Sequence, residues 1–297
     1  MSRADWLSAL VVIVIWGVNF VVMKWGLATL SPLVLCALRF VAASLPFLLF
    51  IKPPRNIAWK LVAAYGLVLG IGQFGVLFTG MKMGMPAGMA SVVLQTQAFI
   101  TMLLAAVFLG EKPKPWQWLG LCIAIVGLIA IGAAHGENTS DMTLAGFLLT
   151  VGAAASWAVT NLITRKAAQQ GQYDAVGFIV WSSLFPIIPL LLLACWMDGA
   201  DSVVQQLSHL GLRELGVVAY LSLLSTIVGY GLWTRLLQRY AASTVAPLSL
   251  LVPVVGLLSA MLLLGERPTG VQWLGTLGVL MGMAINQFGG RWARRAV

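Results

Sequence analysis

Long apolar runs constrain this chain more than any other feature of its sequence. Between charged or proline-rich breaks lie runs of about 20 mostly apolar residues, the length that an α-helix needs to cross about 30 Å of hydrocarbon. Lipid offers no partner to a free backbone N–H or C=O, so each single crossing has to be helical. The sequence predicts ten such spans, at residues 5–25, 32–52, 58–80, 86–109, 116–134, 143–164, 173–197, 213–235, 243–264 and 271–290.

The composition excludes a soluble protein. Hydrophobic residues make up 60% of the 297 residues, charged residues only 9%, and the mean hydropathy is +0.94. A soluble domain carries about 25% charged residues, because its surface has to be wetted. The 12 tryptophans also fit the aromatic belts at membrane–water interfaces. The predicted fold class is therefore an all-α integral membrane protein.

The net charge of +9 is best explained by membrane topology rather than by a nucleic-acid partner. Cytoplasmic loops of membrane proteins collect Lys and Arg. If the N-terminus is cytoplasmic, 13 of the 18 basic residues fall on the inner side of the ten predicted spans, Arg294 and Arg295 among them. The acidic residues Glu137, Asp141 and Asp198 fall on the outer side. We therefore predict a multi-pass protein with both termini in the cytoplasm.

An internal repeat divides the chain into two halves. Residues 110–113 (GEKP) and 117–120 (QWLG) return as 265–268 (GERP) and 272–275 (QWLG), an offset of 155 at each matched position. We predict a first half at 1–136 and a second at 137–297, each with five spans. Because five is an odd number, the second half has to enter the membrane from the opposite side. Inverted repeats of this kind are common in secondary transporters, whose substrate sites lie near the membrane midplane.

Several segments together resemble the EamA-type members of the drug/metabolite transporter superfamily over nearly the whole chain. The segments are residues 16–20 (WGVNF), 85–91 (MPAGMAS), 110–111 (GE), 246–253 (APLSLLVP) and 265–267 (GER). Residues 94–99 (LQTQAF) and 227–231 (IVGYG) are similar to the O-acetylserine/cysteine exporter branch. The resemblance implies a bacterial inner-membrane exporter of small amino-acid-like metabolites, with cysteine and O-acetylserine favoured, working by alternating access.

Arg39 is the most informative polar residue inside a predicted span. Burying it costs about 2.5–3.5 kcal/mol on insertion scales, and no Asp or Glu lies in a span interior to pair with it. An unpaired cation in the membrane suits a substrate that carries a carboxylate. The alternative is that Arg39 extends to the interface or binds helix-end carbonyls.

Two asparagines, Asn19 and Asn161, correspond in the two halves and lie deep in spans one and six. Each follows a tryptophan, Trp16 and Trp157 respectively. An Asn side chain can bind the amino or carboxyl group of a substrate, but it can equally join two helices. The tryptophans either wall a cavity or mark the interface. We predict Asn19, Asn161 and Trp157 as substrate-binding residues.

The repeat breaks at Gln95 and Gln97, whose counterparts are Leu250 and Val252. An asymmetric substrate needs such asymmetry, whereas a purely structural duplication does not. Residues two apart differ by about 200° around an α-helix, so we expect Gln95 rather than Gln97 to face a cavity. Ser249, Gln73 and Tyr230 complete the predicted substrate-binding set.

Other classes of function have less support. A drug exporter driven by proton antiport usually needs an intramembrane carboxylate, and an intramembrane enzyme needs facing His, Asp or Glu residues. The spans contain neither. No cofactor, metal or nucleic-acid partner is predicted. The expected partners are the lipid bilayer and a small amino-acid-like substrate, and the oligomeric state stays open, with a monomer one possibility.

Overall fold

The computed structural model describes residues 1–136, 142–240 and 242–293, and within these ranges every regular element is helical. The all-α prediction is therefore confirmed. The residues Glu137, Asp141, Arg294 and Arg295, which entered the topology prediction, and the start of the predicted second half lie outside the described residues. Among the described residues, eight helical stretches are long and apolar enough to cross a membrane: Arg3–Leu27, Trp59–Lys82, Ala87–Leu109, Pro115–Ala133, Leu144–Gln170, Ala175–Asp198, Leu212–Leu236 and Pro247–Leu264.

Most of these stretches contain more than one element. In the first half the elements are α1 (Arg3–Gly26), α2 (Pro32–Ser44), η1 (Leu45–Phe47), α3 (Trp59–Leu67), η2 (Val68–Gly75), α4 (Val76–Lys82), α5 (Ala87–Val93), η3 (Leu94–Thr96), α6 (Gln97–Leu109) and α7 (Pro115–Ala133). In the second half they are α8 (Leu144–Gln170), α9 (Ala175–Ser182), α10 (Ile187–Asp198), α11 (Ala200–Ser208), α12 (Leu212–Ala219), η4 (Tyr220–Val228), α13 (Gly229–Arg239), α14 (Ala242–Val245), η5 (Ala246–Leu250), α15 (Leu251–Leu264) and α16 (Gly270–Ala293).

The second predicted span is shorter than its apolar run. We expected a helix over 32–52, but the helical segment is Pro32–Phe47, below the length of the eight full spans. Pro46 lacks a backbone N–H, and the chain tightens into the 3-10 turn η1 there before leaving the helix. The apolar residues Leu49 and Phe50 are more than 80% exposed beyond this point. Apolar composition alone therefore overestimated this span.

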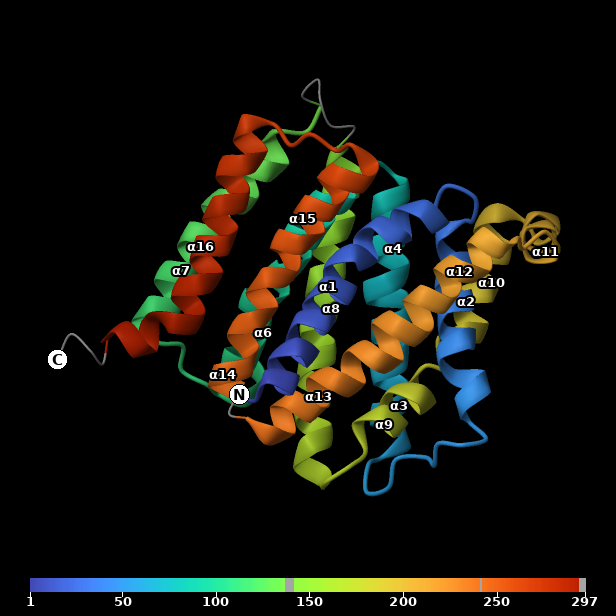
Figure 1. The fold of residues 1–297 in the computed structure, drawn as a ribbon, viewed down its shortest axis with the longest axis horizontal. Coiled ribbons are helices and arrows are strands. Elements are labelled where there is room, and N and C mark those ends of the chain that lie inside the picture. The colour runs from blue at the N-terminus through green and yellow to red at the C-terminus, as the bar shows by residue number, and fades with distance from the viewer. Residues whose placement is uncertain (137–141, 241, 294–297) are drawn as a thin grey trace.

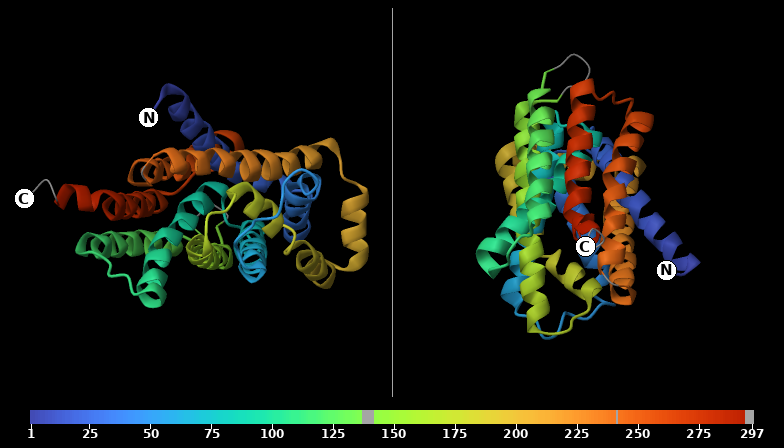
Figure 2. Two further views of the ribbon diagram at one scale, coloured as in Figure 1. Left: turned by 90° about the horizontal axis from the view of Figure 1, so that it is seen from below. Right: turned by 90° about the vertical axis from the view of Figure 1, so that its left-hand side faces the viewer.

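Figure 1 shows the long helices running between two ends of the molecule. The α15–α16 connection lies at the upper end, whereas α6 passes to α7 at the lower end, where α1 also begins and α16 finishes. We call these the Glu266 end and the Glu111 end, after the acidic residue in each connection. Figure 2 shows α7 and α16 as a pair at one side of the bundle.

Glycines bring α7 and α16 into close contact. A Cβ on Gly120 would lie 2.5 Å from the carbonyl oxygen of Gly282, and one on Gly127 would lie 2.5 Å from that of Gly275. Small residues of this kind let the backbones of membrane helices approach one another. The contacts run in opposite directions along the two helices, so α7 and α16 are antiparallel.

The repeated motif residues perform the same structural task in both halves. Gly110 and Gly265 end α6 and α15 in the left-handed conformation, with φ of 67° and 68°, which only glycine adopts at little cost. At the next helix start, Gln117 Oε1 accepts a hydrogen bond from Lys114 N at 2.8 Å. Gln272 Oε1 likewise accepts one from Thr269 N at 3.0 Å. The motif therefore ends one helix and caps the next.

Two long helical stretches, Trp59–Lys82 and Leu212–Leu236, widen to π-helical geometry near their middle. The segments η2 and η4 are π-helical, and they occupy overlapping positions of the repeat in the two halves. Wider turns of this type occur frequently at functional sites, because they free backbone groups and redirect side chains. The segment η2 contains Gln73 and Phe74, and η4 contains Ser225 and Thr226, all of which lie near Arg39 or the cavity described below.

Candidate functional site

All eight residues predicted from the sequence line one cavity of about 330 Å³. Its size is at the lower end of the range of about 300–1,000 Å³ that is usual for small-molecule pockets. The predicted residues in its wall are Asn19, Arg39, Gln73, Gln95, Trp157, Asn161, Tyr230 and Ser249. The other lining residues are Trp16, Phe20, Met23, Phe74, Ser91, Leu94, Gln97, Ser225, Trp233 and Val252.

Arg39 supplies the cavity with a buried positive charge. Its exposed fraction is only 2%, and its guanidinium carbon lies 3.8 Å from the centre of the Phe74 ring, a cation–π contact. Its Nη2 donates a hydrogen bond of 3.1 Å to Thr226 Oγ1. Arg39 therefore neither extends to the interface nor binds helix-end carbonyls, the two alternatives considered above.

The guanidinium retains unused hydrogen-bonding capacity. Within the described residues, Arg39 Nε and Nη1 are buried and have no hydrogen-bond partner. The residues lining the cavity include no Asp or Glu, and the ion pairs found in the described ranges, Arg165–Glu111 and Arg239–Asp5, lie elsewhere. A buried charge without a partner is costly. An anion that enters the cavity would remove this cost.

Two buried amide oxygens in the same wall also have no partner in the described part of the chain: Asn19 Oδ1 and Gln73 Oε1. Asn19 is 6% exposed and Gln73 is 2% exposed. The amide nitrogen of Asn19 reaches only the sulfur of Met23, at 3.8 Å, and a thioether is a weak acceptor. The cavity therefore presents unsatisfied donors on one side chain and unsatisfied acceptors on two others.

The expectation that only one of the two glutamines faces the cavity is wrong, because Gln95 and Gln97 both line it. The helix tightens to 3-10 geometry over Leu94–Thr96. In an α-helix, side chains two residues apart are separated by about 200°, which is about 160° measured the shorter way. At the 3.0 residues per turn of a 3-10 helix, the shorter separation falls to about 120°, so the two side chains point in more similar directions. Gln95 Nε2 is 3.5 Å from Ser249 O, and Gln97 Oε1 accepts a hydrogen bond of 2.7 Å from Asn161 Nδ2.

The two corresponding asparagines have different surroundings. Asn161 Nδ2 is bound by Gln97 and also lies 3.0 Å from Thr101 Oγ1, so Asn161 joins α8 to α6. The side-chain oxygen of Asn19 has no hydrogen-bond partner among the residues that the structure describes. The sequence left a substrate role and a helix-joining role open for both residues. The structure shows a helix-joining contact for Asn161 and a free acceptor for Asn19.

Aromatic rings close another part of the wall. Trp16 packs against Tyr230 and Trp233, with ring centroids 5.3 Å and 5.4 Å apart, and its indole Nε1 donates a hydrogen bond of 3.0 Å to Ser225 O. Trp16 therefore walls the cavity, one of the two roles considered from the sequence. Sequence reasoning did not identify Trp233 or Phe74, because an aromatic residue in an apolar span carries no signal of its own.

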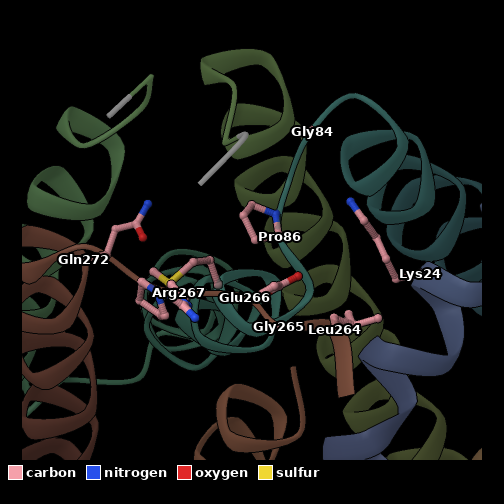
Figure 3. Close-up of a pocket in the computed structure, with 10 residues that line it drawn as sticks. Lys24, Gly84, Pro86, Leu264, Gly265, Glu266, Arg267 and Gln272 are labelled. Carbon is pink, nitrogen blue, oxygen red and sulfur yellow. The ribbon is translucent and has the colours of Figure 1, made fainter. Parts of the chain in front are cut away.

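A second cavity, of about 320 Å³, lies at the Glu266 end. Figure 3 shows Glu266 beside Pro86, where α5 begins, with Lys24 and Gln272 on either side of the pocket. Glu266 Oε1 accepts a hydrogen bond of 2.7 Å from Ala87 N, and its Oε2 accepts one of 2.9 Å from Gly88 N. A carboxylate from the second half thus caps a helix of the first half, a favourable arrangement at a helix N-terminus.

Several apolar helices that can cross a membrane and enclose a polar cavity with a buried cation define a class of protein: a polytopic membrane transporter. In the described ranges, no group of three or more His, Cys, Asp or Glu residues is placed to hold a metal ion. The cavity residues also lack the paired carboxylates that acid–base catalysis uses.

Comparison with known proteins identifies the family. The profile of the EamA-like transporter family matches residues 6–133 and again residues 144–287, and the chain belongs to this family. A protein of Salmonella typhimurium named "Probable amino-acid metabolite efflux pump" is 44% identical over 297 residues, covering 100% of this chain and 99% of the relative. A protein of the same name from Escherichia coli is 43% identical, with the same coverage of both chains.

A solved crystal structure supports the fold alone. It is superimposed with a TM-score of 0.59 at 18% identity, covering 99% of this chain and 98% of the other.

Proposed function

We propose that this chain exports small amino-acid-like metabolites from the bacterial cytoplasm, with cysteine and O-acetylserine as favoured substrates. The unpaired guanidinium of Arg39 in the central cavity is the observation that carries the proposal. It supplies a site for a carboxylate, and its Nε and Nη1 donors suit a two-point contact with the two carboxylate oxygens. The two efflux-pump relatives, which match along their whole length, support the same substrate class.

The preference for cysteine and O-acetylserine rests on two segments. Residues 94–99 supply Gln95 and Gln97, and residues 227–231 supply Tyr230, so both segments that resemble the cysteine-exporter branch contribute to the cavity wall. The small cavity volume also favours short side chains. Other metabolites that carry a carboxylate are the alternative substrates, and drug export by proton antiport is disfavoured because the cavity lining contains no carboxylate.

We further propose that the protein has ten spans arranged as two inverted halves, 1–136 and 137–297. The family profile matches the chain twice, once in each proposed half. The contacts between α7 and α16 support the inversion. Gly120 meets Gly282 and Gly127 meets Gly275, and each contact becomes the other when the repeat offset of 155 is applied. Corresponding helices that pack antiparallel in this way run in opposite directions through the membrane.

We infer alternating access as the mechanism, and the different contacts at the two ends of the molecule support it. At the Glu266 end, Glu266 caps α5, and all seven residues of α5 are buried. At the Glu111 end, its repeat counterpart Glu111 pairs with Arg165, and both side chains are nearly half exposed. This arrangement supports a conformation closed at the Glu266 end and open toward the Glu111 end.

In the opposite conformation the two acidic residues exchange states. Glu266 releases the N–H groups of Ala87 and Gly88, and Glu111 moves to the start of the corresponding helix of the second half. With both termini in the cytoplasm, as the distribution of basic residues predicts, the Glu111 end faces the cytoplasm. The conformation described is then the one that takes up substrate for export.

Reconstitution into liposomes tests the proposed function. Vesicles loaded with labelled cysteine or O-acetylserine should lose label several times faster when their membrane contains the protein than when it contains no protein. If neither compound is released, cysteine and O-acetylserine are not substrates. If no amino acid is released at all, the exporter proposal is wrong. A variant with Gly216→Ala, a position where a Cβ meets no neighbour within 4 Å, is the matched control for preparation effects.

A further inference from the structure

The carboxylate site at Arg39 leaves the two free amide oxygens, Asn19 Oδ1 and Gln73 Oε1, without an explanation. Both are buried in the wall of the same cavity and have no hydrogen-bond partner in the described residues. A buried polar atom without a partner costs about 1–3 kcal/mol, so native structures contain few of them. Because the side chains of Asn19 and Gln73 both line the cavity, a ligand bound there can complete these atoms.

The chemistry of these atoms selects a donor as their ligand. Carboxamide oxygens accept hydrogen bonds and do not donate them. A carboxylate would repel them, whereas an ammonium group carries three N–H donors and can serve both oxygens at once. We propose that Asn19 and Gln73 bind the α-ammonium group of a zwitterionic substrate while Arg39 binds its carboxylate.

The positions of the three residues in the fold agree with this assignment. Gln73 directly precedes Phe74, the residue whose ring holds the Arg39 guanidinium at 3.8 Å, so η2 contributes to both subsites. Asn19 enters from α1, a different helix. The ammonium subsite is built from neutral oxygens rather than carboxylates, which keeps Arg39 free of an intramolecular ion pair. A protein carboxylate in the same wall would compete with the substrate for Arg39.

This arrangement makes the substrate's charge pattern the basis of selection. A zwitterion satisfies both subsites. An amine without a carboxylate meets the positive charge of Arg39 without compensation, and a carboxylic acid without an amine leaves two buried oxygens unpaired. The remaining wall, with Trp16 and Tyr230, contacts the side chain. The inference rests on the proposed function and assigns the groups that recognise its substrate class.

The test compares cysteine with its two truncated analogues as competitors. Proteoliposomes exporting labelled cysteine are titrated with unlabelled cysteine, with 3-mercaptopropionate, which lacks the ammonium group, and with cysteamine, which lacks the carboxylate. We expect cysteine to compete at a concentration at least about tenfold lower than either analogue, the effect of losing one hydrogen-bonded charged group.

The variants Asn19→Leu and Gln73→Met identify the atoms responsible. Each replaces the carboxamide, and with it the acceptor oxygen, by an apolar side chain of similar size. Each should weaken competition by cysteine severalfold while leaving that by 3-mercaptopropionate unchanged, so the ratio between the two falls. Gln97→Met is the matched comparison, because the Gln97 oxygen is already bound by Asn161. It should preserve the ratio whatever its effect on the export rate.

The outcomes separate this inference from the proposed function. If the wild-type protein exports cysteine but both variants keep the wild-type competition ratio, the ammonium subsite is wrong and the exporter proposal stands. If the wild type exports no amino acid, both fail. Elution of each variant as a single peak from size exclusion in detergent establishes that a lowered ratio arises in a folded protein.

Discussion

The Glu266 carboxylate binds the backbone N–H of Gly88 at 2.9 Å, joining the connection after α15 to the first turn of α5. The second carboxylate oxygen binds Ala87 N in the same way. Its repeat counterpart, Glu111, pairs with the side chain of Arg165. Two acidic residues at matching positions of the sequence repeat thus make different contacts in one conformation, which is the asymmetry that the proposed alternating access requires.

The first prediction concerns the closure of the Glu266 end. Glu266→Gln retains one acceptor oxygen and loses the charge, so one of the two charge-assisted hydrogen bonds disappears. A loss of about 1 kcal/mol shifts a two-state population about fivefold. In a protein whose cysteines are replaced, a cysteine introduced by Met89→Cys should react severalfold faster with a membrane-impermeant thiol reagent once Glu266→Gln is added. Met89 lines the pocket at this end and is only 1% exposed.

Glu111→Gln is the matched control for that measurement. Its partner Arg165 lies at the other end, so the variant should not accelerate labelling at position 89. Equal acceleration by the two variants would show that Glu266 has no specific role in closing its end.

The second prediction concerns the packing of α7 on α16. Gly127→Ala places a Cβ 2.5 Å from Gly275 O and 2.8 Å from Val279 N, both backbone atoms, so the helices have to move apart. Overpacking of this kind costs about 1–3 kcal/mol. We expect the thermal unfolding midpoint in detergent, followed by tryptophan fluorescence, to fall by several degrees. Gly216→Ala, in the interior of a helix with open space around it, should leave the midpoint unchanged or raise it. A Gly127→Ala protein as stable as Gly216→Ala would contradict the close contact.

The third prediction concerns orientation. Ser208, at the end of α11, and Gln172, between α8 and α9, are both exposed, and the predicted topology places them on opposite sides of the membrane. In intact cells, a cysteine introduced by Ser208→Cys should react with an impermeant thiol reagent, and one introduced by Gln172→Cys should react only after the cells are opened. The reverse pattern would invert the topology and reassign the open end of the cavity to the outside.

Much of the candidate site was predictable because lipid penalises polar side chains so strongly. Arg39, Asn19 and Gln73 stand out in apolar runs without any structural information, and the structure brings them to one cavity. The left-handed glycines Gly110 and Gly265 were likewise marked by their repeat. Features that depend on long-range contacts were not visible in the sequence. Nothing in the neighbourhood of Glu266 indicates that its carboxylate caps a helix that begins 179 residues earlier in the chain.

Local backbone geometry accounts for the remaining differences. The side chain of Gln97 lines the cavity because a 3-10 turn of three residues precedes it. An ideal α-helix would have turned this side chain further away from the cavity. The π-helical segments that position Gln73 and Thr226 have no signature in residue type. The early end of the second helical segment, Pro32–Phe47, depends on Pro46 within an otherwise continuous apolar run.

The Arg39→Gln variant tests the central claim most directly, because it removes the cavity's positive charge and keeps a polar, uncharged side chain. The measurement is the initial rate of release of labelled cysteine from proteoliposomes, with wild-type protein and with the variant, at equal amounts of folded protein. We predict a loss of at least about tenfold, in line with about 1.5–3 kcal/mol for a hydrogen bond to a charged group. Arg39→Lys should fall between the two, because Lys keeps the charge but not the planar two-point contact. Release by Arg39→Gln at the wild-type rate would contradict the claim that this cavity binds a carboxylate through Arg39.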